Sequence, residues 1–405
     1  MNRTFYIVLV AQFLSALADN ALLFAAIGLL MAVNAPDWHQ PMLQESFVIA
    51  YIALAPFVGP FADALPKGQV MFLGNALKFV GCLAMLLNLQ PLLAYSVVGV
   101  GAAIYSPAKY GILTEILPPK KLVAANGWME GTTVAAIVLG AIIGGYLINP
   151  DVAQAGLSWL ANLSRFTAPM FAILAITLLY LSAAIVNLLI PHVPIDHKLP
   201  KKSPGFILHD FWHSFTLLWK DPLGQVSLAV TTLFWGVGAT LRLILLPWAA
   251  FNLALGLDRA TQMTSLTALG IAIGATFAGK LVRLEKSVKV IPAGIAIGFL
   301  PILLIWITNA WVAGAILLLS GILSGFFVVP MNALLQHRGH LIMGAGHSIA
   351  VQNFNENIGI LILIGAYALM SRSDMHIHSI MLLFGLFISI VMSLIWMRHH
   401  NDEVH

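Results

Sequence analysis

The sequence predicts an all-α polytopic membrane protein with twelve transmembrane helices in two similar six-helix halves. Three observations support this fold class: an apolar composition, twelve long apolar segments, and a weak repeat of motifs between the halves. Of the 405 residues, 60% are hydrophobic and only 9% are charged, whereas a soluble domain carries about 25% charged residues. The net charge of +4 comes from basic residues in short loops, so it indicates membrane topology rather than nucleic-acid binding.

Twelve apolar segments are each long enough to cross a hydrocarbon layer of about 30 Å. Their approximate ranges are 5–33, 42–62, 70–89, 92–113, 123–148, 167–190, 226–250, 263–284, 288–307, 311–335, 347–370 and 377–397. The longest polar connection, 192–221, separates an N-terminal half, 1–191, from a C-terminal half, 222–405. Within this connection, 206–215 has the pattern of an amphipathic helix lying on the inner membrane surface.

The basic residues of the loops are distributed unequally between the two sides of the membrane. Loops after the even-numbered segments, together with the termini, contain 14 Lys and Arg residues, and the opposite loops contain 3. The larger set is Arg3, Lys67, Lys120, Lys121, Lys198, Lys201, Lys202, Lys220, Lys280, Arg283, Lys286, Lys289, Arg338 and Arg398. The smaller set is Arg165, Arg259 and Arg372. Because positively charged loops stay in the cytoplasm, both termini are expected to be cytoplasmic.

Several motifs recur in the same order in the two halves. Asp19 in the first segment corresponds to Arg242 in the seventh, and Pro107 in the fourth corresponds to Pro330 in the tenth, both at an offset of 223 residues. Two six-helix halves related by an axis along the membrane normal describe the major facilitator architecture, whose substrate site lies near the midplane between the halves. The repeat therefore predicts that Asp19 and Arg242 lie near each other across a central cavity.

Six ionisable residues other than His or Tyr lie clearly inside the apolar segments, away from their ends. They are Asp19, Lys78, Lys109, Glu130, Arg242 and Glu356. An ionised Asp at bilayer depth costs roughly 2.5–3.5 kcal/mol on insertion scales, so such residues face protein or water and mark candidate transport pathways. Asp19 and Arg242 are interpreted as a structural ion pair, as two parts of a ligand site, or as both. Lys109 either points into the cavity or snorkels to the cytoplasmic interface, and Lys78 is assigned to packing or snorkelling.

Amide side chains accompany the intramembrane charges. They would lack hydrogen-bond partners in lipid, so their helix faces are expected to line the cavity and bind substrate. The amides assigned to the site are Gln12, Asn20, Asn126, Asn332 and Gln352. Three aromatic residues near the charges are assigned as apolar gates, namely Phe24, Phe234 and Trp235. At the end of the second segment, Gly59 and Asp63 form a Gly-x-x-x-Asp pattern similar to the conformational loop of the major facilitator fold, although the arginines of that loop are absent.

Four sequence blocks resemble the bacterial lysophospholipid transporter family. They are 11–24, 105–113, 326–336 and 350–353, and the likeness covers nearly the whole chain. The resemblance implies a flippase that moves lysophosphatidylethanolamine and related lysolipids from the outer to the inner leaflet of a bacterial inner membrane. Transport would proceed by alternating access with lateral substrate entry, and a separate acyltransferase and acyl-carrier-protein synthetase would reacylate the lipid. We expect no enzyme activity, cofactor or metal in this chain, and we expect a monomer.

A zwitterionic lysolipid headgroup fits the charges of the candidate site. Its phosphate would lie near Arg242 or Lys109, because guanidinium and ammonium groups bind phosphate. Its ammonium would lie near Asp19, Glu130 or Glu356, and its acyl chain would leave through a gap between the halves. Two other functions stay open at this point. One is a proton-coupled exporter of amphipathic drugs or other small molecules, with one of these carboxylates as the proton carrier, and the other is a membrane-embedded scaffold that does not transport.

Overall fold

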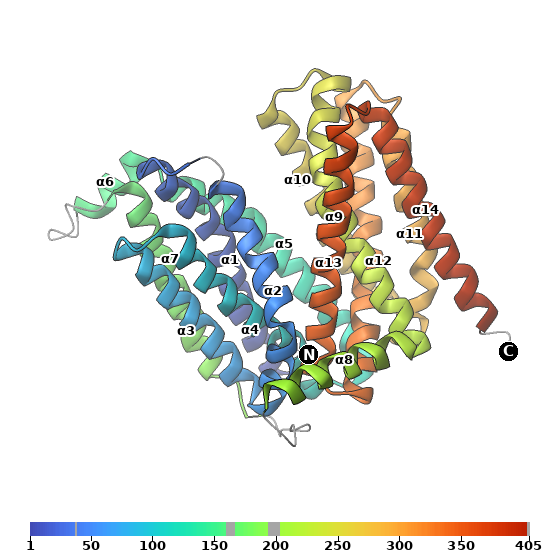
Figure 1. Ribbon diagram of the computed structural model, residues 1–405, viewed down its shortest axis with the longest axis horizontal. Helices are drawn as coiled ribbons and strands as arrows, with labels where there is room; N and C mark the ends of the chain where they lie inside the picture. Colours follow the sequence, from blue (N-terminus) through green and yellow to red (C-terminus); the bar gives the residue numbers. More distant parts are fainter. Residues whose placement is uncertain (37–38, 159–166, 193–202, 403–405) are drawn as a thin grey trace. The chain divides into compact units, whose positions relative to one another are not determined.

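The computed structural model describes residues 1–36, 39–158, 167–192 and 203–402, and each of the twelve predicted segments is helical in it. The first helices along the chain are α1 (Arg3–Ala32), α2 (His39–Ala64), α3 (Lys67–Leu86), α4 (Pro91–Ile116), η1 (Pro119–Lys121), α5 (Leu122–Leu147), α6 (Pro150–Ser158) and α7 (Ala168–Leu188). They are followed by α8 (Pro204–Lys220), α9 (Pro222–Leu253), α10 (Leu257–Leu281), η2 (Leu284–Val290), α11 (Ile291–Leu304), α12 (Ala310–Ile342), α13 (Ala345–Arg372) and α14 (Ile377–Asp402). The whole set is drawn in Figure 1.

Most of these helices are suited to a membrane. Among the described residues, 11 helices are long and apolar enough to span a bilayer, and the shorter apolar helix Ser265–Leu281 lies within α10, at the predicted eighth segment. The predicted amphipathic segment is part of α8, whereas the short helix α6 was not predicted. The position of α8 on a membrane surface stays a prediction. Four basic residues that entered the topology count, Arg165, Lys198, Lys201 and Lys202, lie outside the described residues.

Local sequence determines several helix ends. The side chain of Asn2 accepts a hydrogen bond from the backbone N–H of Phe5, at 2.9 Å, and begins α1, as expected of an N-cap residue. Asp221 does the same for α9 by accepting from the N–H of Gly224 at 2.8 Å. The chain turns sharply there, between α8 and α9 (Figure 1).

Asp221, at the turn between α8 and α9, also binds a side chain from a third helix. Arg338 of α12 forms a two-bond ion pair with it, of which the bond from Nε to Oδ2 measures 3.0 Å. Partial burial acts to raise the pKa of Asp221, but the hydrogen bonds from Arg338 and from the N–H of Gly224 outweigh it, so the pKa lies below its ordinary value. The corner between α8 and α9 is therefore held by a charged pair.

The chain forms two compact units. The first contains Met1–Leu117, Ala135–His213 and Met343–Val351, and the second contains Pro118–Val134, Ser214–Ile342 and Gln352–His405. The unit boundaries fall inside α5, α8 and α13, so each of these helices contributes to both units. The division of the sequence repeat at 191 and 222 stays a prediction, because these units are defined by packing rather than by repeat.

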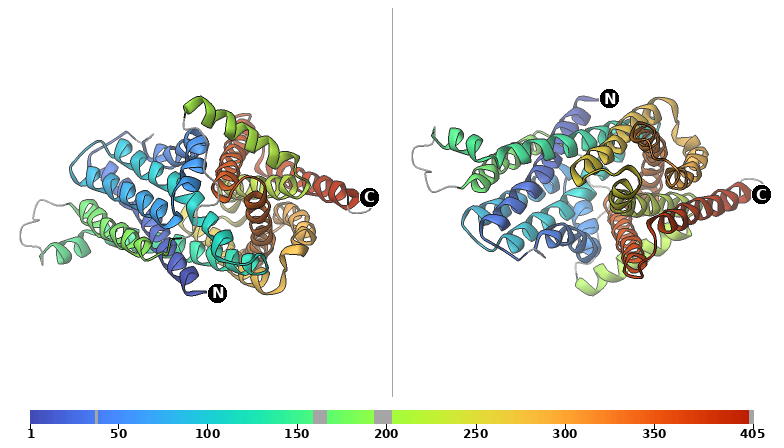
Figure 2. Two further views of the ribbon diagram at one scale, coloured as in Figure 1. Left: turned by 90° about the horizontal axis from the view of Figure 1, so that it is seen from below. Right: turned by 90° about the horizontal axis from the view of Figure 1, so that it is seen from above.

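The first unit is built on α1, α3, α4 and α7. Within it α3 packs on α4 and on α7, and α1 packs on α7; Figure 2 shows these blue to green helices side by side from two directions. A Cβ atom added at Gly101 of α4 would lie 2.6 Å from the carbonyl oxygen of Gly74 in α3. Glycine is therefore required where the two helices approach most closely, as is common between transmembrane helices.

The second unit is built mainly on α9, α10, α11, α12 and α14. Within it α10 packs on α12, and α11 packs on α14. A Cβ atom added at Gly274 of α10 would lie 2.0 Å from the carbonyl oxygen of Ile322 in α12, so this contact also depends on glycine. The buried centre is apolar and includes Trp248, Phe327 and Met381.

Candidate functional site

A buried ion pair occupies the centre of the first unit. The Lys78 ammonium of α3 lies 2.8 Å from Oδ2 of Asp19 in α1 and donates a second hydrogen bond of 3.0 Å to the Ser15 hydroxyl. The Tyr180 hydroxyl of α7 donates to the other carboxylate oxygen of Asp19, at 2.7 Å. The Lys78 side chain is 1% exposed and that of Asp19 is 26% exposed. The carboxylate is thus the accessible end of this cluster.

Lys78 does not snorkel to a membrane surface and does more than pack, because it is the ionic partner of Asp19 within the first unit. Helix packing makes this pairing possible, since Lys78 and Asp19 lie on helices that share the first unit. Ser15 and Asp19 lie four residues apart on one face of α1, and both contact Lys78. The proximity of Asp19 and Arg242 stays a prediction.

The second unit contains an apolar cavity of about 380 Å³. Phe234, Trp235 and Arg242 of α9 contribute to its wall, opposite apolar residues of α10, α11, α12 and α14. The rings of Phe234 and Trp235 pack edge to face, with 5.4 Å between their centres. Of the described residues that line this cavity, Arg242 alone carries a charge. An apolar space with a single guanidinium in its wall suits an amphipathic anion.

A second polar cluster lies within the second unit, where α5, α12 and α13 contribute side chains. Gln352 donates both to Glu356, at 2.7 Å, and to Asn332, at 2.9 Å. Asn332 in turn lies 3.5 Å from Glu130. The two glutamate side chains are nearly buried, at 4% and 8% exposure.

A pair of amide side chains lies one helix turn away from this cluster, on α5 and on α12. Asn126 and Gln336 exchange two hydrogen bonds of 2.9 Å, each donating to the other's carbonyl oxygen. Four residues assigned to the site from sequence (Glu130, Asn332, Gln352 and Glu356) are thus linked in one polar network, and a fifth, Asn126, belongs to the neighbouring amide pair. Amide dipoles in this network bind the carboxylates without neutralising them, so the cluster can accept a cationic group or a proton.

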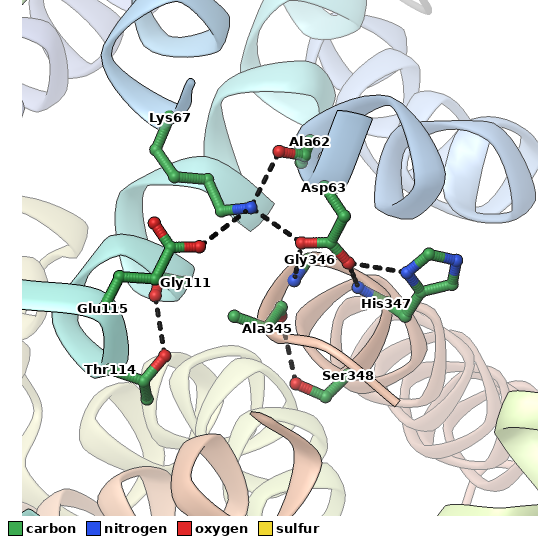
Figure 3. Close-up of polar contacts among 10 residues, drawn as sticks. All are labelled: Ala62, Asp63, Lys67, Gly111, Thr114, Glu115, Ala345, Gly346, His347 and Ser348. Atoms are coloured by element: carbon green, nitrogen blue, oxygen red, sulfur yellow. Dashed lines mark hydrogen bonds and ion pairs between the residues drawn. The ribbon is translucent and has the colours of Figure 1, made fainter. Parts of the chain in front are cut away.

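The end of α2 and the start of α3 form a third cluster, which we call the latch, with α4 and the first turn of α13 (Figure 3). Asp63 accepts hydrogen bonds from the backbone N–H groups of Gly346 and His347, at 2.8 and 3.0 Å. The first N–H groups of a helix have no acceptor within the helix itself, so a negative charge is favourable there. Lys67 contacts the same carboxylate at 2.7 Å and Glu115 of α4 at 3.2 Å.

The latch is closely packed as well as charged. A Cβ atom at Gly59 would lie 3.0 Å from the Cα of His347, so only glycine allows this approach without adjustment. The His347 ring bridges two carboxylates, with Nδ1 at 2.6 Å from Asp63 and Nε2 at 3.1 Å from Asp210 of α8. The loop residues Gly59 and Asp63 assigned from sequence therefore contact the start of α13 directly.

The remaining residues assigned to the site are Gln12, Asn20, Lys109 and Phe24. Gln12 is fully buried in α1, and Asn20 donates to the carbonyl oxygen of Ala16 in its own helix, at 2.8 Å. The Lys109 ammonium lies 4.3 Å from the centre of the neighbouring Tyr110 ring. Phe24 is 36% exposed.

The contributors to the clusters that were not assigned from sequence include Lys78, Gln336 and His347. A signal was present for two of them. Lys78 follows Asn75 by three residues on one helix face, and Gln336 follows Asn332 by one turn. His347 gave no such signal, because its partners lie far away in the chain.

Comparison with known proteins gives the relatives of this chain. It matches the Major Facilitator Superfamily over residues 4–364. The lysophospholipid transporter LplT of Serratia proteamaculans (strain 568) is 44% identical over 371 residues, covering 91% of this chain and 89% of the relative. The transporter of the same name from Yersinia pestis (strain Pestoides F) is 43% identical over 374 residues, covering 92% and 88%.

Two solved structures show the same fold. A bacterial homologue of the iron transporter ferroportin in an outward-facing state has a TM-score of 0.74 at 17% identity, covering 99% of this chain and 100% of that chain. The transporter FucP in an outward conformation has a TM-score of 0.75 at 15% identity, covering 98% of each chain. The predicted major facilitator fold is confirmed. The chain is therefore a multi-pass membrane protein of the major facilitator superfamily and belongs, within it, to the family of the relatives named lysophospholipid transporter LplT.

Proposed function

We propose that this chain is a flippase that moves lysophosphatidylethanolamine and related lysolipids from the outer to the inner leaflet of a bacterial inner membrane. The observation that carries this proposal is the 43–44% identity, over about nine-tenths of the chain, to transporters named for lysophospholipid. The charges of the candidate site agree with that substrate class, because they offer both a cationic and an anionic contact within an apolar protein.

The headgroup phosphate would bind Arg242, whose planar guanidinium forms two parallel hydrogen bonds with phosphate oxygens. Lys109 would add a point charge. The ammonium of an ethanolamine headgroup would bind Asp19 or the pair of Glu130 and Glu356. A site of this kind needs the phosphate and gains further affinity from the amine.

The apolar cavity beside Arg242 would hold the acyl chain close to the headgroup. Its volume of about 380 Å³ falls within the range of about 300–1,000 Å³ that is typical of small-molecule sites. Lateral entry between the halves, as predicted from sequence, would deliver a lipid to this cavity without exposing its chain to water. Phe234 and Trp235 would act as gates at the wall of the cavity.

Alternating access would require the latch to open. Asp63 and the start of α13 belong to different halves of the sequence repeat, and rocking of one repeat against the other is the usual transport movement in this fold. The latch would hold one conformation and release it when the substrate binds.

The cellular setting completes the proposal. The 14-to-3 distribution of basic loop residues supports cytoplasmic termini. Lysolipid delivered to the inner leaflet would be reacylated there by a separate acyltransferase and acyl-carrier-protein synthetase. The transporter would act as a monomer.

The proposal is tested in proteoliposomes that contain the purified protein and labelled lysophosphatidylethanolamine. Albumin extracts the label from the outer leaflet, so a label that becomes inaccessible has crossed the bilayer. We expect transfer above protein-free vesicles, none with Arg242→Ala, and equal weakening of ethanolamine and glycerol lysolipids with Lys109→Ala. No transfer by the wild-type protein would reject the function, whereas a silent Lys109→Ala would reject only the role of Lys109.

A proton-coupled exporter of amphipathic drugs is the second candidate. The buried cluster of Glu130 and Glu356 favours it, because two carboxyl groups close together bind a proton readily. The two functions differ in their need for a gradient. Flux of lysolipid that persists when an ionophore dissipates the proton gradient supports the flippase, and drug flux that disappears under the same treatment supports the exporter.

A further inference from the structure

The Asp19–Lys78 pair is asymmetric in its access. The Lys78 side chain is 1% exposed, and the Asp19 side chain is 26% exposed. A ligand that reaches this cluster therefore meets the carboxylate first, with the lysine behind it. The positive charge still acts on such a ligand, because it lies 2.8 Å from the carboxylate oxygen in surroundings where charges are weakly screened.

The protein holds Lys78 in this position from several sides. Its ammonium donates to Ser15 at 3.0 Å and lies 5.0 and 5.6 Å from the ring centres of Tyr105 and Tyr180. A Cβ atom at Gly101 would lie 2.8 Å from Cγ of Lys78, so the glycine leaves room for the lysine stem against α4. The side chain is thus fixed behind Asp19 rather than free to reach a membrane surface.

We propose that Lys78 is a specificity-determining positioning residue, which neutralises Asp19 from the buried side so that the transporter accepts anionic as well as zwitterionic lysolipids. This inference rests on the proposed function. An isolated Asp19 carboxylate would attract the ethanolamine ammonium and repel a lysophosphatidylglycerol headgroup, which has a phosphate but no amine. With Lys78 in place, the local net charge is zero, and the preference between the two headgroups is reduced.

The test is the ratio of ethanolamine to glycerol lysolipid transfer in proteoliposomes. A neighbouring charge changes the equilibrium between the charged and uncharged forms of a group by about tenfold or more, and we expect an effect of similar size on the binding of a charged headgroup. We expect Lys78→Met to raise the ratio by about tenfold and Asp19→Asn, which leaves the lysine unpaired, to lower it by a similar factor. The double variant removes both charges, so its ratio should return near the wild-type value. Lys78→Arg keeps the charge and should also keep the ratio.

Tyr180→Phe is the matched control. It removes one hydrogen bond of 2.7 Å from the same carboxylate without changing any charge, so it should alter both rates alike and leave the ratio unchanged. Where Lys78→Met fails to fold, the comparison of Asp19→Asn with the double variant measures the same lysine charge in a background without a carboxylate. Equal ratios in those two proteins, or in Lys78→Met and the wild type, would overturn the inference. Absence of transfer by the wild-type protein would instead reject the proposed function.

Discussion

The latch makes a quantitative prediction about Asp63. The side chain of this residue is 4% exposed and accepts hydrogen bonds from Lys67 and from two backbone N–H groups at the start of α13. Asp63→Asn preserves its shape but removes its charge, and the amide presents a donor where the carboxylate presents an acceptor. Lys67 would then keep Glu115, at 3.2 Å, as its carboxylate partner.

The expected magnitude follows from the two hydrogen bonds that Asp63 accepts from the start of α13. A hydrogen bond to a charged group contributes about 1.5–3 kcal/mol, so the two together contribute about 3–6 kcal/mol. Each 1.36 kcal/mol corresponds to a tenfold change in an equilibrium, so even the lower limit would shift the closed latch towards its open form about 100-fold or more.

A disulfide cross-link can measure this shift. A Cβ atom at Gly111 of α4 would lie 3.2 Å from the Cβ of Ala345 at the start of α13, close to the separation of about 3.8 Å that a disulfide needs. We expect Gly111→Cys with Ala345→Cys, in a protein whose buried Cys82 is replaced by Ser, to cross-link under mild oxidation. Addition of Asp63→Asn should slow the reaction strongly.

The control removes a carboxylate from an exposed pair. Glu285 lies 3.6 Å from Arg283, and both side chains are more than half exposed, so Glu285→Gln should leave the rate unchanged, as is usual for surface ion pairs. A cross-linking rate in Asp63→Asn equal to that of the parent would show that the carboxylate does not hold α13, and the latch would lose its physical basis.

Three further predictions concern topology, headgroup recognition and packing. Cysteines at Ser203 and Thr261 should react with an impermeant reagent from opposite sides of the membrane; labelling from the same side would contradict the twelve-helix topology. Glu356→Gln should slow lysophosphatidylethanolamine transfer about tenfold more than lysophosphatidylglycerol transfer, because a hydrogen bond to a charged group contributes about 1.5–3 kcal/mol, and equal losses would exclude an ammonium contact. Gly59→Leu should lower the melting temperature in detergent, since overpacking costs about 1–3 kcal/mol, and an unchanged melting temperature would show that the first turn of α13 yields without strain.

The amino-acid sequence by itself determined the secondary structure and the fold class of this protein. Twelve apolar segments were recognised because a helix that crosses a hydrocarbon layer needs about 20 apolar residues, a signal that depends only on neighbours in the chain. The polar helix faces were recognised for the same reason, because they too depend only on residues close together in the chain. Glu130, Asn332 and Gln352 each gave a signal within their own helix, and all three belong to one network.

Tertiary structure alone decided which charges are paired. Packing of α3 beside α7 and α4 in the first unit brings Lys78 to the Asp19 carboxylate, whereas the proximity of Asp19 and Arg242 that the repeat predicts stays a prediction. In the latch, His347 reaches Asp63 across 284 positions of the chain. Two charged side chains form an ion pair only where their helices lie close enough together. The distance between two helices depends on where small residues allow their backbones to approach. Spacing along a single helix carries no information about that distance.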